Sequence, residues 1–407
     1  MAQETVDDRL AGADADDARR LATGLTALGV PSAVLVMSGT HLINDIFNNI
    51  YAPLLPLLIP RLHLSLTAAG VLAASIQVAG SVAQVVFGPL ADRWRPRVLA
   101  VAGPLASVAL LSLVGLATSP LMLGSLLVAG CLGSAAFHPT AAAVVNRVGG
   151  DRRGTAMSVH VTGGAMGNAI APIIFAPFAQ YFGLNWTPLL AIPALGVLVA
   201  LVRRMPDVRL GHGAGPHGFG ALRRYAVPLS LLWSAVVIRT IVALGFSTFL
   251  PVLMTSRGFS ISEAGLAVSS YLVAGSVGGF AGGPVADRFG PRRVIALSLA
   301  LTVPLLLAAL AMSGPAALVV LTAGGFFLGS TLPLNIAYAH TIAPVATGTV
   351  SSLMLGVAWG VGGLSVPLVG MAGDTIGLQP ALEMLACLPA VAAVLTLRLP
   401  ERTTHSA

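Results

Sequence analysis

Long apolar stretches dominate this chain, and Pro, Gly and Arg residues separate each stretch from the next. A helix of about 20 apolar residues crosses the hydrocarbon core of a bilayer, and each stretch is about that length or longer. The pattern therefore predicts an all-α membrane protein with twelve transmembrane helices. They are expected at residues 30–59, 65–90, 98–118, 120–146, 153–182, 184–202, 227–256, 261–286, 294–313, 315–340, 347–373 and 378–398.

Charged residues are absent from two very long segments. None occurs in 98–146 or in 294–373, and Asp, Glu, Lys and Arg together make up only 9% of the chain. Soluble domains contain about 25% charged residues, whereas the mean hydropathy here is +0.88. These values exclude a soluble globular enzyme.

The segments outside the apolar stretches predict the domain organisation. The first residues are acidic and lack an apolar core, unlike a secretory signal peptide, and GHGAGPHGFG indicates a flexible linker. We expect a disordered acidic cytoplasmic tail (1–29), an N-terminal six-helix bundle (30–202), a cytoplasmic linker (203–226), a C-terminal six-helix bundle (227–398) and a cytoplasmic tail (399–407).

The positions of the Arg residues predict how the chain is oriented. All 22 basic residues are Arg; with the amino terminus inside, sixteen lie in or beside cytoplasmic loops and only Arg61 and Arg257 lie on the opposite side. Cytoplasmic loops carry such an excess of positive charge. We therefore expect a multi-pass protein of the inner (plasma) membrane with both termini in the cytoplasm. Short Arg clusters between apolar stretches do not indicate a nucleic-acid-binding face.

Several other classes of protein are disfavoured. Cys131 and Cys387 lie in apolar stretches without metal-ligand spacing, so we expect no metal and no cofactor. The chain has no Lys and no phosphate-binding Gly-Lys-Ser/Thr loop, which excludes an ATP-driven pump. The His residues are scattered singly over spans and loops, which argues against a membrane-embedded enzyme. No ring of like charges indicates a channel.

The two halves of the chain repeat each other. A shift of 195 residues aligns 68–97 with 263–292, and over residues 69–98 there are 15 identities in 30. Each half has an even number of predicted helices, so both halves enter the membrane with the same polarity. Such parallel repeats are related by an axis along the membrane normal, and a substrate site is expected between them near the midplane.

The repeat includes a recognisable loop motif. The loop after the second predicted helix reads Gly88-Pro-Leu-Ala-Asp92-Arg93-x-x-Pro-Arg97, and its copy reads Gly283-Pro-Val-Ala-Asp287-Arg288-x-x-Pro-Arg292. Both resemble the signature of the major facilitator superfamily. The resemblance implies the major facilitator fold, with two pseudo-symmetric six-helix bundles, and a cytoplasmic latch that favours the outward-open state. The alternative is an Arg cluster that only sets the topology.

Three shorter motifs resemble one subfamily. His41-x-x-Asn44-Asp45, Phe137-His138-Pro139 and Gly163-Gly164 are similar to fosmidomycin-resistance-type efflux proteins. The chain departs from these relatives at Thr140 and Thr341, where they carry Glu. This difference leaves the substrate and proton chemistry of the subfamily open for this chain.

The first predicted helix has a polar face. His41, Asn44, Asp45 and Asn48 are spaced three or four residues apart, which places them on one side of a helix at about half its depth. Ionisable groups within a membrane are costly and indicate function by default. Asp45 is the one carboxylate expected deep in the bilayer, and a change in its protonation state would couple transport to protons. A static contact between helices is the alternative.

Arg239 is the one Arg expected deep in the membrane. The shift of 195 matches it to Asn44 and matches Thr240 to Asp45, so we expect Arg239 and Asp45 to approach each other across the central axis. Because Arg stays protonated, it can hold Asp45 ionised or bind a carboxylate, phosphate or phosphonate. A permanent structural pair is the alternative.

Four further polar residues are candidates for the substrate and proton pathway. An imidazole ordinarily titrates near neutrality, so His138 and His160 could relay protons, or they could be neutral side chains held by a neighbour. Gln77 could line the cavity or bond to a packed helix, and Asn335 lies near Pro333 in the tenth predicted helix.

Together these features predict a secondary active transporter that binds a small-molecule substrate and protons within the lipid bilayer. We expect proton-coupled export of a small organic solute by a functional monomer that is not an enzyme. Proton-coupled uptake of a small organic anion is the alternative within transport. Resistance to toxic compounds on overexpression would favour export, and inward accumulation of a labelled anion would favour uptake.

Overall fold

The computed structural model describes residues 30–93, 96–206, 219–344 and 347–400, which are helical with no β-strand in these ranges. Twelve helical stretches in this part of the chain are long and apolar enough to cross a membrane. The expectation of an all-α protein with twelve membrane helices in two pseudo-symmetric bundles is confirmed.

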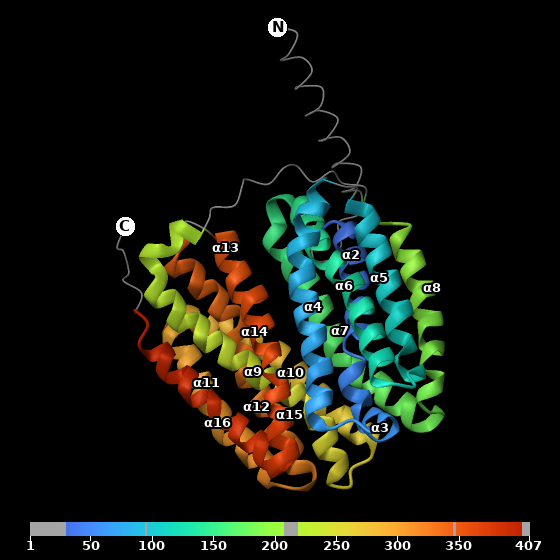
Figure 1. The fold of residues 1–407 in the computed structure, drawn as a ribbon. Helices are drawn as coiled ribbons and strands as arrows, with labels where there is room; N and C mark the ends of the chain where they lie inside the picture. Colours follow the sequence, from blue (N-terminus) through green and yellow to red (C-terminus); the bar gives the residue numbers. More distant parts are fainter. Residues whose placement is uncertain (1–29, 94–95, 207–218, 345–346, 401–407) are drawn as a thin grey trace, which may run out of the picture.

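The first six spans form one half of the molecule, coloured blue to green in Figure 1. Their elements are α2 (Ser32–Asn48), α3 (Tyr51–Leu62), α4 (Leu66–Arg93), α5 (Pro96–Ser112), η1 (Leu113–Leu116), α6 (Pro120–Val148), η2 (Gly150–Arg152), α7 (Arg153–Phe182), η3 (Leu184–Leu190) and α8 (Ala191–Val202).

The last six spans form the other half, coloured yellow-green to red. Their elements are η4 (Phe219–Tyr225), α9 (Ala226–Ser256), α10 (Ile261–Phe289), α11 (Pro291–Ala311), α12 (Gly314–Ile342), α13 (Thr347–Ser351), the π-helical η6 (Ser352–Val357), α14 (Ala358–Leu364), α15 (Val366–Ile376) and α16 (Leu378–Leu397).

Two of the predicted helices are interrupted. The first span is broken between α2 and α3, and the eleventh is divided into α13, η6, α14 and α15. Proline explains a break in each, because Pro53 and Pro367 have no N–H to donate to the carbonyl groups of Asn49 and Gly363.

The repeat recurs in the turns of the two halves. Gly183 ends α7 and Gly377 ends α15, with φ of 88° and 94° respectively. A positive φ is readily adopted only by glycine, so the same residue type makes the same turn in both halves.

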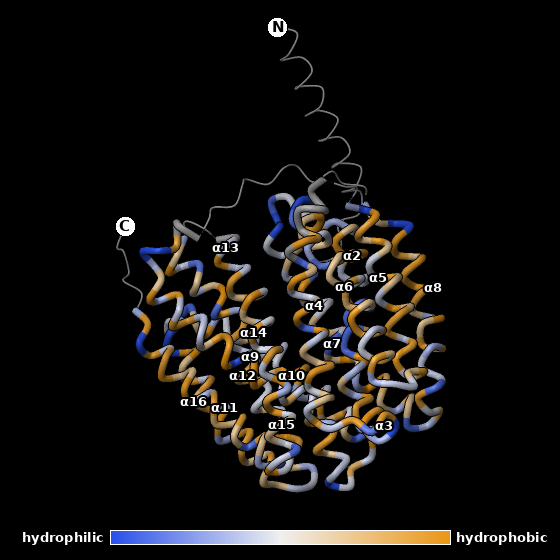
Figure 2. Tube along the Cα trace, in the orientation of Figure 1, coloured by the Kyte–Doolittle hydropathy of each residue, from blue (hydrophilic) through white to orange (hydrophobic). Residues whose placement is uncertain are grey.

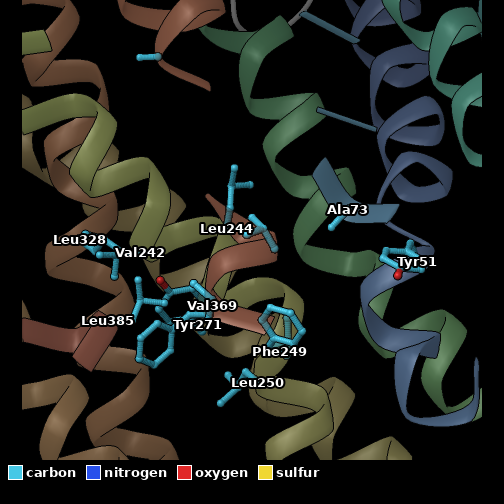
Figure 3. Close-up of a cluster of buried hydrophobic side chains, with 14 of the residues drawn as sticks. Tyr51, Ala73, Val242, Leu244, Phe249, Leu250, Tyr271, Leu328, Val369 and Leu385 are labelled. Carbon is cyan, nitrogen blue, oxygen red and sulfur yellow. The ribbon is translucent and has the colours of Figure 1, made fainter. Parts of the chain in front are cut away.

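The halves pack against each other through α7 with α10, α4 with α14 and α15, and α3 with α9. In Figure 1 they converge near the labels α3 and α15, which we call the convergent end, and they spread apart toward α13 and the other end of α4. One apolar cluster includes residues of both halves, among them Tyr51, Phe249 and Val369 (Figure 3). Contact between the halves is therefore concentrated at the convergent end.

The outer surface is apolar. Leu121, Ile192 and Val319 are at least 67% exposed although they lie on membrane-spanning helices. Figure 2 shows hydrophobic colour along most helices and hydrophilic colour mainly at their ends. Such a surface suits contact with lipid hydrocarbon.

Candidate functional site

A buried carboxylate lies between two imidazoles in the N-terminal half. Asp45 is on α2, one helical turn after His41, and its Oδ2 lies 3.4 Å from His41 Nε2. Its Oδ1 lies 3.2 Å from Nε2 of His138, which α6 contributes. We call His41, Asp45 and His138 the His–Asp–His cluster. Asp45 is only 5% exposed, whereas the side chain of His138 is 26% exposed, so protein encloses the carboxylate but not the whole cluster.

Two amides complete the hydrogen bonding of the carboxylate. Asn44 donates from Nδ2 to Asp45 Oδ1 at 2.9 Å and to Ser134 Oγ at 2.8 Å. Asn168 on α7 donates to Asp45 Oδ2 at 2.9 Å. The carboxylate thus has an amide and an imidazole beside each oxygen, which is how a charge buried in a helical bundle is stabilised.

The imidazoles have acceptors at both ring nitrogens. Nδ1 of His41 lies 2.9 Å from the carbonyl oxygen of His160, and Nδ1 of His138 lies 2.8 Å from that of Ser134. Each Nε2 faces Asp45. A neutral imidazole carries only one N–H, whereas a protonated one donates from both nitrogens. Each ring can therefore donate to both of these oxygens only when it binds an additional proton, although Nδ1 of a neutral His138 can instead accept from the Ser134 hydroxyl 3.3 Å away.

His160 lies against the cluster without bonding to the carboxylate. Its ring centroid is 4.4 Å from that of His41, and the ring of Phe137 packs beside both. Nδ1 of His160 is buried and has no hydrogen-bond partner in the part of the chain that the structure describes. His160 therefore adds a third ionisable ring next to His41, and the three histidines that the sequence scatters over separate helices are in fact gathered together.

Small residues of α7 allow the close approach that forms the cluster. A Cβ atom at Gly164 would lie 2.5 Å from Cε1 and 2.8 Å from Cδ2 of His41, and one at Gly167 would lie 3.1 Å from Cβ of Asp45. A Cβ at Gly163 would lie 2.6 Å from the carbonyl oxygen of Ser38. These glycines bring α7 against the polar face of α2, as small residues do between membrane helices.

The cluster also has the residue types of a metal site. One potential ligand atom from each of its three residues lies within 4.8 Å of the others. However, both carboxylate oxygens already accept amide hydrogen bonds, and both Nε2 atoms face these oxygens. A metal ion would have to displace these contacts, so the arrangement fits proton binding better.

Arg239 occupies the other half of the molecule. It lies on α9, is 6% exposed, and its Nε is 3.5 Å from the carbonyl oxygen of Leu328 on α12. No ion pair joins it to Asp45 in the described part of the chain, where histidines and amides contact Asp45. The expected approach of these two residues is therefore wrong for this conformation. Amide and imidazole donors of α2, α6 and α7 are the partners of Asp45 in place of Arg239.

Several polar atoms of α9, α10 and α12 are buried without a hydrogen-bond partner among the described residues. Among the described residues, Nη1 of Arg239 and the hydroxyl of Tyr271 on α10 are both buried without a hydrogen-bond partner. Both amide atoms of Asn335, seven residues beyond Leu328 on α12, are also unpaired. Unsatisfied buried polar groups are rare in proteins and call for a physical explanation.

Two other predicted candidates lie outside the cluster. Asn48 is half-buried on α2, and its Oδ1 has no hydrogen-bond partner within the described ranges. Gln77 on α4 packs toward the C-terminal half, where a Cβ at Gly363 would lie 2.5 Å from Gln77 Cβ. The packing alternative for Gln77 therefore describes its position better than a cavity lining.

The signature loops are only partly described. The side chains of Asp92 and Arg93 and the surroundings of Gly88 lie outside the described residues, and Arg97 is half-buried. In the copy, a Cβ at Gly283 would meet no atom within 4 Å, Asp287 and Arg288 are exposed, and Arg292 is half-buried. The copied loop thus makes no close contact through Gly283 in this conformation.

Three residues of these sites were absent from the sequence-based candidates. Asn168 and Ser134 contribute to the His–Asp–His cluster, and Tyr271 lies near Arg239. An Asn in the middle of an apolar span was a usable signal for Asn168. Ser and Tyr are common in membrane helices, so their roles depended on knowing which helices are neighbours.

Comparisons with known proteins agree on one family. The sequence profile described as Major Facilitator Superfamily matches residues 37–260 and 232–407. The chain is 33% identical to an uncharacterized MFS-type transporter, YfnC, of Bacillus subtilis, over 90% of this chain and 92% of that protein. It is 29% identical to the fosmidomycin resistance protein of Escherichia coli, over 92% and 94% of the two chains.

A solved structure shows the same fold. It is a bacterial homolog of the human lysosomal transporter Spinster, in an inward-facing and unoccupied conformation, with a TM-score of 0.77 and 17% identity over 90% of this chain and 96% of that one. Twelve spans in two repeated halves, the signature loops and the profile match all lead to one assignment. The chain belongs to the major facilitator superfamily of membrane transporters.

Proposed function

We propose that this protein exports a small organic solute in exchange for protons, and that the His–Asp–His cluster carries the proton. The observation on which this depends is that His41 and His138 each have an acceptor at both ring nitrogens. Proton binding completes these hydrogen bonds, and proton loss from His41 leaves a ring lone pair facing an acceptor. We further propose a monomer in the cell membrane with both termini in the cytoplasm.

Charge balance explains how the cluster would couple to transport. With Asp45 ionised, one protonated imidazole makes the cluster neutral, and loss of that proton leaves a net negative charge inside the bundle. A buried net charge is costly, so the deprotonated cluster favours a conformation that admits water or a substrate. A ligand moves an equilibrium only if it binds the two conformations unequally, and the proton meets this condition.

The name of one relative supports the proposed direction of transport. The fosmidomycin resistance protein covers almost the whole chain, and export of a compound is one route to resistance. Its name makes fosmidomycin the first compound to test here.

Inverted membrane vesicles test the proposal. With the lumen made acidic, we expect wild-type vesicles to accumulate labelled fosmidomycin, or another compound from an efflux panel, and to release luminal protons at the same time. Asp45→Asn keeps the size of the side chain but removes its charge, and it should abolish the gradient-driven component. Accumulation that is equal with and without the pH gradient would contradict proton coupling.

A matched control tests whether the loss of coupling is specific to the His–Asp–His cluster or follows from replacing any histidine. His63 is exposed in a loop with φ of 50°, a conformation that Asn tolerates. His63→Asn should leave transport unchanged, whereas His138→Gln should abolish coupling. A chelator in the assay tests the metal alternative: loss of wild-type transport on chelation would favour a metal ion over a proton.

A second candidate function is proton-coupled uptake of a small organic anion, and the unpaired Nη1 of Arg239 is the observation that favours it. A guanidinium with a free N–H can donate to a carboxylate or phosphate, and the Tyr271 hydroxyl could donate to the same anion. Right-side-out vesicles should then accumulate labelled carboxylates or phosphates, and Arg239→Gln should prevent it. Accumulation only in inverted vesicles would leave export as the function.

A further inference from the structure

Two polar contacts tie the halves together at the convergent end. The first joins α15 to the start of α4. Asp374 accepts hydrogen bonds from the backbone N–H of Leu66 at 2.9 Å and of Thr67 at 2.8 Å, and from the Thr67 hydroxyl at 2.6 Å. A carboxylate of one half thus caps the N-terminus of a helix in the other half, where free N–H groups and the helix dipole attract negative charge.

The second contact joins α7 to the start of α10. Gln180 accepts through Oε1 from the backbone N–H of Ser262 at 2.8 Å and from its hydroxyl at 2.9 Å. This contact runs in the opposite sense, from the N-terminal half to a helix of the C-terminal half. Each half therefore caps the N-terminus of one helix in the other half.

The two caps are equivalent in the internal repeat. The shift of 195 residues carries Thr67 onto Ser262, and the shift of 194 that aligns Gly183 with Gly377 carries Gln180 onto Asp374. The same arrangement has thus been built twice about the axis that relates the halves. The copies differ in charge, because one acceptor is a carboxylate and the other a neutral amide.

Neighbouring residues account for this difference. The first turn of α10 already contains Glu263, which forms a capping box with Ser260, so a second carboxylate there would be repelled. The described first turn of α4 has no acidic residue. Asp374 of the C-terminal half therefore supplies to the first turn of α4 the negative charge that Glu263 supplies to the first turn of α10 from within that helix.

Backbone contact between the halves accompanies the caps. A Cβ at Gly70 would lie 2.7 Å from Pro367 Cα, and one at Gly265 would lie 2.7 Å from the carbonyl oxygen of Pro172. Because these contacts join α4 to α15 and α10 to α7, both capped helices touch the other half closely. Such contacts cannot survive a rotation that separates the halves at this end.

We propose that Asp374 and Gln180 form a repeat-related gate, and that Asp374 is its stronger part. The gate holds the convergent end closed and releases when the transporter opens on that side. Asp374 and Gln180 are both exposed, so water can replace each cap when the halves separate. This inference goes beyond the proposed function, because it requires alternating access but no particular substrate, direction or proton carrier.

Distances between spin labels test the gate in the full-length protein. The labels are placed at Trp186 and Met312, which are exposed at the convergent end on opposite halves. The native cysteines Cys131 and Cys387 are first replaced by Ser. The distance between the two labels then reports whether the convergent end is open. We expect one dominant short distance in the wild-type sequence. Asp374→Asn should raise the ratio of open to closed molecules about three- to tenfold, the size expected for losing a charge at a helix N-terminus together with its charge-assisted hydrogen bonds.

Three variants separate the gate from general destabilisation. Thr67→Val removes only the hydroxyl donor and should give a smaller increase in the open state, and Gln180→Ala should also increase it. Glu263→Gln removes a carboxylate from a helix N-terminus without crossing between the halves, so it should leave the distances unchanged. The proposal is overturned if Asp374→Asn and Thr67→Val, both folded by size-exclusion chromatography, leave the distances unchanged, or if Glu263→Gln opens the gate equally.

The same variants distinguish this proposal from the proposed function. A gate variant should change the maximal transport rate while transport still depends on the pH gradient. If Asp45→Asn loses its dependence on the pH gradient but keeps the wild-type distances between the labels, the gate proposal still holds. If Asp374→Asn leaves these distances unchanged, the gate proposal fails, but the proposal of proton coupling is not affected.

Discussion

Gly164 offers a way to disturb the His–Asp–His cluster without replacing any of its members. A Cβ atom at this position would lie 2.5 Å from Cε1 and 2.8 Å from Cδ2 of His41. Ordinary contacts between such atoms are about 3.5–4.0 Å, so Gly164→Ala requires the imidazole to move by about 1 Å. The ring is the end of a side chain, and it can move more easily than the backbone of either helix.

The expected loss follows from the contact that the movement breaks. Nε2 of His41 is already 3.4 Å from Asp45 Oδ2, so a further displacement of that size removes the hydrogen bond. A hydrogen bond to a charged group contributes about 1.5–3 kcal/mol, and about 1.4 kcal/mol corresponds to a factor of ten in an equilibrium. We therefore expect Gly164→Ala to weaken proton binding, and with it gradient-driven transport, about 10- to 100-fold.

The assay is gradient-driven accumulation in inverted vesicles, measured over a range of luminal pH and accompanied by thermal unfolding of the purified protein. Gly154→Ala is the matched control, because it lies on the same helix and a Cβ there would meet no atom within 4 Å. Alanine favours a helix over glycine by about 1 kcal/mol, so neither variant should lose much stability. Wild-type coupling in Gly164→Ala would refute the role of the His41–Asp45 contact.

Three further predictions concern stability and transport. Gly167→Ala meets the backbone of α2 rather than a movable ring, so it should destabilise the protein by about 1–3 kcal/mol, measured as a lower thermal midpoint. Gly329→Ala meets the backbone of Gly275 between α12 and α10 and should destabilise by a similar amount, with Gly356→Ala, which meets no atom within 4 Å, as an unaffected control. Arg239→Met removes a buried charge with an unpaired donor, so it should raise stability by about 1–4 kcal/mol while lowering transport; a fall in the thermal midpoint would show that Arg239 is a structural residue.

The sequence alone determined the features that depend on local pattern. Apolar length predicted twelve spans, and the spacing of His41, Asn44 and Asp45 placed them on one helical face. The repeat was also readable, because it is a similarity between two stretches of one chain. These predictions were correct because helix periodicity and membrane thickness constrain each segment separately.

The partners of each polar residue were decided only by the tertiary structure. His138 and Asn168 reach Asp45, whereas Arg239 remains with Leu328 in the other half. The repeat correctly related Arg239 to the first span, but it specified neither the distance between the two halves nor their relative rotation. Equivalent positions in a repeat share a depth, yet they meet only in a conformation that brings their helices together.

Packing between helices determines which polar residues become neighbours. The absence of a side chain at Gly164 lets α7 approach the polar face of α2, and the contact of Asp374 with Thr67 joins positions 307 residues apart in the chain. Helix rotation and axial register depend on many small contacts of this kind along a whole interface. No single segment contains that information, so the cluster and the gate became visible only when the helices were placed side by side.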